Sequence, residues 1–134
     1  MREILFRGKR KDFDNEWLEG FYTLYNDNRG MKPAIITGTE KHCFIPLEIV
    51  PETVGQYTGL TDENGKKIFE GDIMPVYEQG EEYYYKVIYN GDCFMLAMLD
   101  SEQGSYPLSV KHNISKVIGN IHDNPELLKG GGEG

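Results

Sequence analysis

Residues 51–75 constrain the fold more than any other stretch of this sequence, because they hold the signals of a tight β-hairpin. Asn64 and Gly65 are the dipeptide that favours a two-residue type I′ turn, in which both residues have positive φ. Residues 57–61 and 66–69 flank this turn and can pair as antiparallel strands. The sequence therefore predicts a hairpin at this position.

Residues with a special backbone role recur through the same stretch. We predict that they set turns, bulges and tight connections, because glycine accepts positive φ and Asn and Asp bond nearby backbone amides. They are Gly55, Tyr57, Gly59, Asn64, Gly65, Gly71 and Asp72. Further on, Pro75 predicts an edge or bulge position, because proline has no N–H to donate to a sheet.

Short apolar segments separated by turn residues continue along the chain, and 16 glycines and 6 prolines among 134 residues favour β over α structure. Residues 83–89 and 93–99 predict two central strands around a turn at residues 90–92. Five short strands joined by tight turns are typical of a small, partly open barrel of the SH3 or OB kind. We predict a mainly β fold with an SH3-like barrel over residues 51–128, on which an N-terminal lobe of β-hairpins, residues 1–50, is packed.

The end of the predicted barrel domain has the signals of a short helical turn. Asn124 suits the N-cap, Pro125 the first helical position and Glu126 the first turn, where a carboxylate meets the positive end of the helix dipole. Residues 129–134 are mostly glycine and predict a flexible tail.

The net charge of −8 is unevenly distributed. Residues 1–32 carry seven Lys and Arg against six Asp and Glu, and residues 33–134 carry seven against sixteen. This acidity argues against nucleic acid as a partner, because Lys and Arg normally supply the electrostatic part of that affinity. Charges interrupt the N-terminal residues, and no apolar run approaches the roughly 20 residues of a membrane span. We therefore expect a cytoplasmic protein with no membrane contact.

Basic and aromatic side chains provide a candidate binding surface. The basic cluster is Arg7, Lys9, Arg10 and Lys11. Alternation along a predicted strand places Tyr83 and Tyr85 on one face, and exposed aromatic side chains on a small barrel can stack bases or grip peptides. The alternatives are a solvated end of an edge strand for the basic cluster and core packing for the tyrosines.

Four motifs span nearly the whole chain: FRGK from Phe6, PETVGQYTGLTDENGKKIFEGDI from Pro51, NGDCF from Asn90 and VIGNIHDNPELL from Val117. Together they resemble the YopX-like proteins encoded by bacteriophages and prophages, and the long central motif is the most specific. The resemblance implies a mainly β fold with SH3-type barrel character and a phage origin, so that the protein would act in a bacterial host cell. It implies no assigned biochemical activity and no catalytic residue.

Four carboxylates flank the predicted hairpin: Asp62, Glu63, Glu70 and Asp72. Carboxylates that converge can hold Mg²⁺ or Ca²⁺, or act as an acid and a base. Their positions in turns give a structural alternative, in which Asp72 bonds backbone amides. We favour the structural interpretation and predict no metal site, no cofactor and no catalytic residue.

The cysteines and histidines lack the spacing of metal ligands. A strand would turn the neighbours His42 and Cys43 to opposite faces, and His112 and His122 lie ten residues apart. Cys93 falls in a predicted apolar strand, where a thiol is normally inert. These residues predict neither a zinc site nor a nucleophile.

The leading hypothesis for function is a non-enzymatic phage accessory protein that binds a host or phage protein, or that assembles with itself. Two alternatives are a nucleic-acid-binding barrel and an acidic mimic of DNA that inhibits a host protein. A metal-dependent hydrolase that uses Asp62, Glu70 and Asp72 is a third.

Overall fold

A computed structural model describes residues 4–12, 16–38, 44–91, 93–99, 104–108 and 116–127 of the chain. The chain divides into two compact units, unit 1 (residues 1–57) and unit 2 (residues 58–134). The boundary falls inside a strand, whereas the boundary predicted from the sequence lies between residues 50 and 51. Each unit has its own hydrophobic core.

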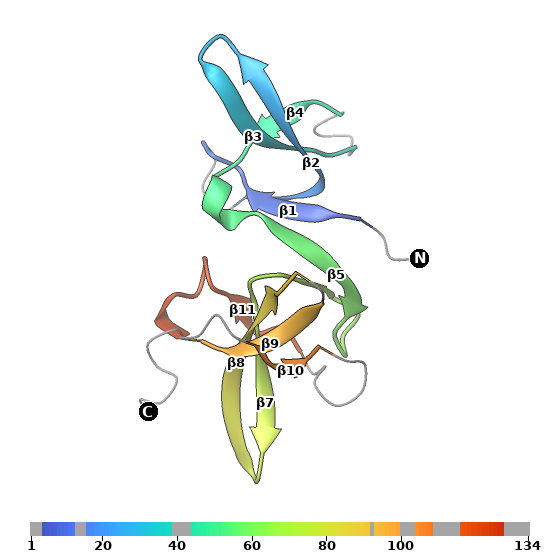
Figure 1. The fold of residues 1–134 in the computed structure, drawn as a ribbon, viewed down its shortest axis with the longest axis vertical. Coiled ribbons are helices and arrows are strands. Elements are labelled where there is room, and N and C mark those ends of the chain that lie inside the picture. Colours follow the sequence, from blue (N-terminus) through green and yellow to red (C-terminus); the bar gives the residue numbers. More distant parts are fainter. Residues whose placement is uncertain are drawn as a thin grey trace. The chain divides into compact units, whose positions relative to one another are not determined.

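Eleven strands and one 3₁₀ turn make up the regular structure of the described residues (Figure 1). Those of unit 1 are β1 (Phe6–Lys9), β2 (Trp17–Asp27), β3 (Gly30–Ile36), β4 (Pro46–Glu48), η1 (Pro51–Thr53) and β5 (Gly55–Thr61), which continues into unit 2. Those of unit 2 are β6 (Lys67–Phe69), β7 (Asp72–Glu78), β8 (Glu81–Tyr89), β9 (Phe94–Met98), β10 (Gly104–Pro107) and β11 (Gly119–Asn120).

The strands of unit 1 follow the order β4-β3-β2-β1-β5, and their pairings are antiparallel. β2 is rich in aromatic residues and β3 ends in two β-branched isoleucines, and both residue types favour strands. The two strands form a hairpin whose last residue pair is Asp27 and Gly30. β1 and β2 form a second hairpin. The predicted N-terminal β-hairpins are therefore confirmed.

The ends of β1 and β4 meet, so that the strands of unit 1 curl around its core. Arg10 bridges to Ile49, and the Lys11 N–H donates to the Glu48 carbonyl at 2.9 Å. The curl encloses a core of inward-facing side chains. They are Leu18, Ile35, Leu47 and Ile49, with Phe6 and Val54 packed against them.

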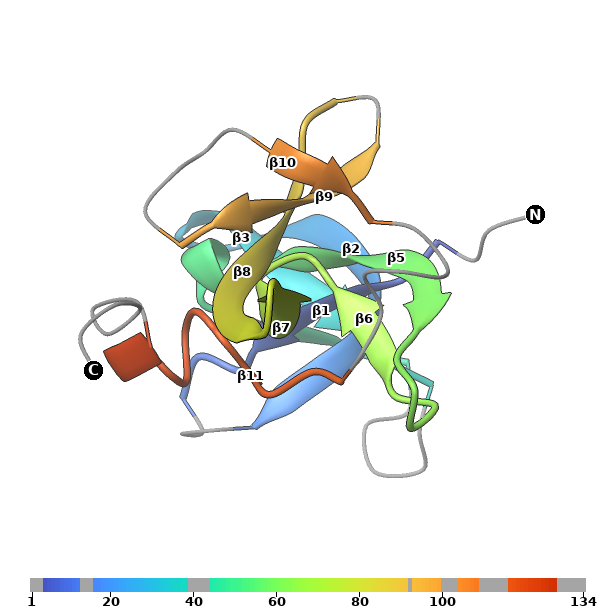
Figure 2. The same ribbon diagram turned by 90° about the horizontal axis from the view of Figure 1, so that it is seen from below.

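In unit 2 the strand order is β10-β9-β8-β7-β11, and Figure 2 shows β10 alongside β9. β8 and β9 each have a neighbour on both sides, so their predicted central position is confirmed. Pro75 lies on β7 beyond the two residues that pair with β11, which gives it the predicted edge position. The buried core residues are Ile68, Met74, Tyr85, Val87, Phe94 and Leu96.

The predicted hairpin at residues 57–69 is confirmed, but its predicted turn type is wrong. The Gly65 N–H donates to the Asp62 carbonyl at 2.9 Å, and the Asp62 N–H donates to the Lys66 carbonyl at 2.8 Å. Gly65 has a φ of +83°, whereas Asn64 does not have positive φ. These features define a type I turn followed by a left-handed glycine.

The two-residue type I′ turn occurs instead between β7 and β8. Gln79 and Gly80 have φ values of +52° and +83°, and the flanking residues Glu78 and Glu81 pair directly. Positive φ at both central residues is the requirement of this turn type. The sequence signal at this position is weaker, because Gln is not one of the residues that commonly adopt positive φ.

The mainly β fold is confirmed, with the strands arranged in two antiparallel sheets and no closed barrel among the described residues. The SH3-like character of the barrel stays a prediction. A helical turn begins at Glu126 as expected, but the Asn124 side chain accepts from the Asn120 N–H at 3.1 Å and does not cap that turn. The predicted flexible tail lies outside the described residues. No helix in the described part of the chain is long and apolar enough to cross a membrane.

Candidate binding surface

Unit 1 exposes several large apolar side chains although it has a complete core. They are Ile4, Phe21, Tyr22, Leu24, Met31, Phe44 and Ile45. Scattered exposed apolar residues are normal on a soluble protein, whereas a contiguous group is typical of an interaction site. The register of the strands shows which of these residues are neighbours.

One row of apolar side chains crosses β2, β3 and β4 on the face opposite the core of unit 1. Phe21 pairs with Ile36, and Ile36 pairs with Pro46. Directly paired residues of antiparallel strands project to the same side of the sheet. Because alternate residues point to opposite faces and Ile35 lies in the core, this row faces away from it.

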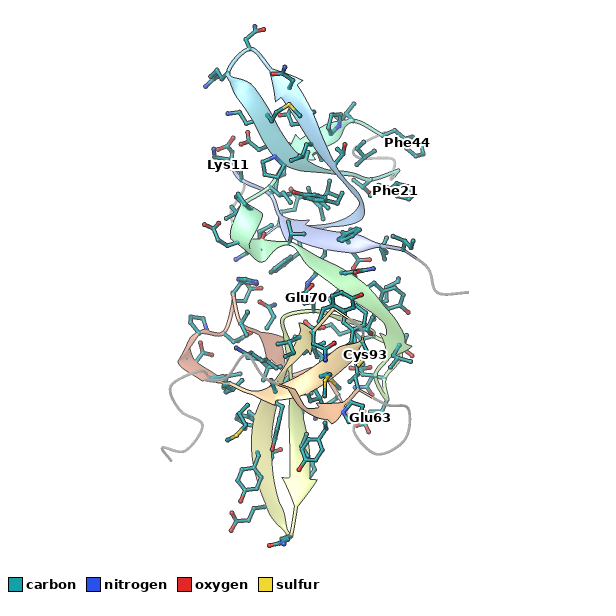
Figure 3. All side chains as sticks on the ribbon, viewed as in Figure 1. Lys11, Phe21, Phe44, Glu63, Glu70 and Cys93 are labelled. Carbon is teal, nitrogen blue, oxygen red and sulfur yellow. The ribbon has the colours of Figure 1, made fainter. Side chains whose placement is uncertain are left out.

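Phe44 extends this row beyond the end of β3. A Cβ atom added at Gly38 would lie 2.6 Å from the Phe44 ring, so the ring lies over the glycine. The Phe44 N–H donates to the Thr37 carbonyl at 2.9 Å, which fixes the backbone close to β3. In Figure 3 the side chains of Phe21 and Phe44 project from the same side of unit 1. We call Phe21, Ile36, Phe44 and Pro46 the Phe21 patch.

The backbone of Phe44 is strained. Its φ is +61°, and a bulky residue in this left-handed region costs about 1 to 2 kcal/mol. Phe44 remains 69% exposed, so burial in the chain itself does not offset this cost. Strained backbone is enriched at binding sites, where the surrounding structure holds it in place.

The basic cluster does not form an open cationic surface. The Arg7 side chain is buried and its guanidinium lies over the Trp17 ring, 4.7 Å from the centroid. Lys9 lies over the same ring at 5.7 Å. Arg10 forms an ion pair with Glu16 at 3.1 Å. The charges of this cluster are therefore engaged within unit 1.

Lys11, the last residue of the basic cluster, is engaged in the same way. Its ammonium group lies 3.3 Å from the carboxylate of Glu48 on β4.

The two candidate tyrosines have different environments. Tyr85 is 7% exposed and packs in the core of unit 2, as the core-packing alternative predicted. Tyr83 is exposed, and its hydroxyl donates to Glu81 at 3.2 Å. Both tyrosines lie in unit 2 and the four basic residues lie in unit 1, so neither unit by itself contains all six residues of the predicted surface.

The Asp62 carboxylate joins two distant segments of unit 2. Oδ1 accepts from the N–H groups of Asn64 (2.8 Å) and Lys66 (2.9 Å), and Oδ2 accepts from the N–H of Val117 (2.9 Å). Burial is the largest single influence and raises the pKa of Asp62, but these three donors and the charge of Lys66 together hold it below its ordinary value of 3.8.

Asp72 has a similar structural role in the next connection. It is 1% exposed, and its Oδ2 accepts from the Phe69 N–H at 2.8 Å across the tight turn at Gly71. Gly71 itself donates to the Val87 carbonyl, and its carbonyl accepts from the Ile121 N–H, each at 2.9 Å. Two of the four carboxylates considered as metal ligands, Asp62 and Asp72, thus accept from backbone amides.

The other residues of the central motif have backbone roles too. Gly59 has a φ of +91°, and Gly55 pairs with Arg7 where β5 meets β1. Tyr57 is 8% exposed, and its N–H donates to the Leu5 carbonyl at 2.7 Å.

No group of three His, Cys, Asp or Glu side chains in the described ranges could hold a metal ion. Cys93 was predicted to lie in an apolar strand, but it is an exposed residue of the turn before β9. Asn90 defines this turn, because its side-chain oxygen accepts from the Cys93 N–H at 3.0 Å. His42, Cys43 and His112 lie outside the described residues, and His122 lies in a turn.

The fold defines a mainly β protein of two antiparallel units. The family model described as YopX protein matches residues 5–129, so the chain belongs to the YopX family, as its four motifs indicated. The crystal structure of protein EF1440 from Enterococcus faecalis is similar in fold, with a TM-score of 0.53 and 22% identity over 96% of this chain and 100% of that chain. No curated protein matches the chain.

Proposed function

We propose that the chain is a non-enzymatic protein-binding β module that acts in the cytoplasm of a bacterial cell carrying a phage or prophage. The observation that carries this proposal is the Phe21 patch, in which Phe21 and Phe44 are 63% and 69% exposed. Aromatic side chains commonly dominate the energy of protein interfaces. Burying one such side chain contributes about 1.5 to 3 kcal/mol.

The decisive experiment is capture of partners on the immobilised full chain, followed by comparison of matched variants. Phe21→Ser and Phe44→Ser each remove one ring of the patch from a different segment. Leu24→Ser removes an apolar side chain of similar exposure (54%) from the opposite face of β2. We expect both Phe variants to lose the captured protein and Leu24→Ser to retain it. Equal capture by all four forms would contradict the proposal.

An acidic mimic of DNA is a second candidate, favoured by the charge of unit 2. Unit 2 carries six Lys and Arg against thirteen Asp and Glu, a net charge of −7, whereas unit 1 carries eight against nine. Glu81 and Glu82 begin β8 directly after the turn that joins it to β7. Under this alternative, the variant Glu81→Gln/Glu82→Gln would lose a captured DNA-binding protein, and DNA would compete with it. Capture that is unaffected by the double substitution and by competing DNA would exclude the DNA-mimic function.

A nucleic-acid-binding function has less support. It requires basic side chains available to phosphates, and Arg10 and Lys11 are each held by a carboxylate.

A further inference from the structure

The chain contains two Asn-Gly pairs, Asn64-Gly65 and Asn90-Gly91. An asparagine that precedes glycine can react with its own backbone, because glycine has no Cβ atom to shield its nitrogen from the neighbouring side chain. The two pairs lie in different turns of unit 2, between β5 and β6 and between β8 and β9. The hydrogen bonds of each turn decide which pair can react in the folded chain.

The turn at Asn64 holds the nitrogen that this reaction needs. The Gly65 N–H donates to the Asp62 carbonyl at 2.9 Å. The N–H groups on either side of it, those of Asn64 and Lys66, donate to the Asp62 side chain at 2.8 and 2.9 Å. The Gly65 nitrogen can attack the Asn64 side chain only after this turn opens, and local opening costs free energy.

The turn at Asn90 leaves the corresponding nitrogen accessible. Asn90 and Gly91 are both exposed, and a Cβ atom added at Gly91 would meet no atom within 4 Å. No hydrogen bond between residues that the structure describes uses the Gly91 N–H. The Gly91 nitrogen can therefore approach the Asn90 side chain without first breaking such a bond.

The Cys93 N–H polarises the side-chain amide of Asn90. It donates to Asn90 Oδ1 at 3.0 Å, so it would stabilise the negative charge that forms on this oxygen when Cγ is attacked. Asn90 Nδ2, the leaving group, donates to Met95 Sδ at 3.1 Å, and a thioether is only a weak acceptor. The turn thus activates the carbon that is attacked and holds the leaving group weakly.

We propose that Asn90 is a site of spontaneous deamidation in the folded chain. The Gly91 nitrogen loses its proton to solvent and bonds to Asn90 Cγ, the Cγ–Nδ2 bond breaks, and Nδ2 takes up a proton and leaves as ammonia. Water then opens the resulting succinimide at one of its two carbonyls and leaves aspartate or isoaspartate. Water is the only other reactant, so the conversion requires no partner and its outcome is independent of the proposed function.

Conversion changes the charge and the backbone of this turn. One added carboxylate takes the net charge of unit 2 from −7 to −8. An aspartate side chain keeps an acceptor for the Cys93 N–H, and its charge strengthens this bond. Isoaspartate instead adds a methylene to the backbone where the Asn90 N–H donates to the Cys93 carbonyl at 3.1 Å, and so it disturbs the turn.

Incubation of the full chain at mildly alkaline pH, with and without urea, tests the proposal. Trypsin cleaves after Lys66 and Lys86, so peptide mass mapping follows Asn64 and Asn90 separately in one sample. In urea both sites should convert at similar rates, because each precedes glycine. In the folded chain Asn90 should convert at least about tenfold faster than Asn64, because only the turn at Asn64 must first open.

Asn90→Gln is the matched control, because its longer side chain would have to close a larger and less favoured ring. This variant should show no conversion at position 90 and an unchanged rate at Asn64. Equal protection of the two sites by folding would overturn the proposal. Faster conversion of Asn64 than of Asn90 in the folded chain, or a folded chain in which Asn90 does not react, would overturn it too.

Discussion

The two units differ in the kind of side chain that they place outside their cores. Unit 1 leaves apolar groups such as Phe21 and Phe44 exposed, with no polar atom to satisfy. The exposed large hydrophobics of unit 2 are mainly tyrosines, and the hydroxyls of Tyr77, Tyr83 and Tyr89 each donate to a nearby oxygen. Unit 2 also buries Asp62 and Asp72 to fix its connections. The difference indicates that the polar groups of unit 2 stabilise its fold, whereas the apolar groups of unit 1 are available to a partner.

The largest effect should come from Asp62→Ala, which removes an acceptor for three backbone donors in unit 2. We expect a loss of about 3 kcal/mol in the free energy of unfolding, because the variant loses three hydrogen bonds to a buried carboxylate. Urea unfolding followed by circular dichroism measures this loss. Glu63→Ala, at the exposed neighbouring position, is the control and should cost less than about 0.5 kcal/mol. An equal loss in the free energy of unfolding for the two variants would mean that Asp62 is an ordinary turn residue.

A smaller effect should distinguish the two residues of the predicted Asn-Gly turn. Gly65→Ala should cost about 1 to 2 kcal/mol, because alanine is strained at a φ of +83° even though its Cβ would meet no atom within 4 Å. Asn64→Ala should cost less than about 0.5 kcal/mol, since Asn64 does not have positive φ. Urea unfolding of both variants measures the difference. Similar costs at both positions would favour the type I′ turn instead.

The Asp62 carboxylate should also make the stability of unit 2 depend on pH. Its pKa in the folded chain lies below the ordinary value of 3.8, so its contribution is fully present above that value and is lost as pH falls through the lower folded pKa. Wild type should therefore lose more stability than Asp62→Asn between about pH 6 and about pH 2. Parallel pH profiles in urea unfolding would show that the charge of Asp62 is not coupled to folding.

The smallest predicted effect is a change in the pKa of an exposed tyrosine of unit 2, without a change in stability. The Tyr77 hydroxyl donates to Glu82 at 2.8 Å, and this bond is the main cause that raises the pKa of Tyr77 above its ordinary value of 10.0. Glu82→Gln should therefore lower the pKa of Tyr77, as measured by the pH titration of its ring resonances in NMR spectra. An unchanged titration would mean that the pair does not persist in solution.

Much of the fold could be predicted from local sequence, because aromatic and β-branched segments between turn residues define β8, β9 and the hairpin at residues 57–69. The predicted turn type was wrong because the prediction used Asn64 and Gly65 and left out Asp62. Aspartate at the first position and glycine at the fourth are the signature of a type I turn, and Asp62 and Gly65 fit it.

The candidate site depended on information that is absent from local sequence. Alternation along β8 placed Tyr83 and Tyr85 on one face, but whether that face is covered depends on residues far away in the chain. The Phe21 patch was missed for a similar reason, because it joins three strands through their register and adds Phe44 through contact with Gly38. Sequence reasoning assigns such aromatics to a core by default.

The central claim is that Phe21 contributes to binding and not to the stability of unit 1. The most direct test measures both properties of Phe21→Ser under one set of conditions. Trp17, the single tryptophan, lies in unit 1 and reports its unfolding by urea through fluorescence, while capture on the immobilised chain reports binding of a partner protein. We predict that capture is lost while the free energy of unfolding changes by less than about 0.5 kcal/mol. A loss of stability with unchanged capture would contradict the account.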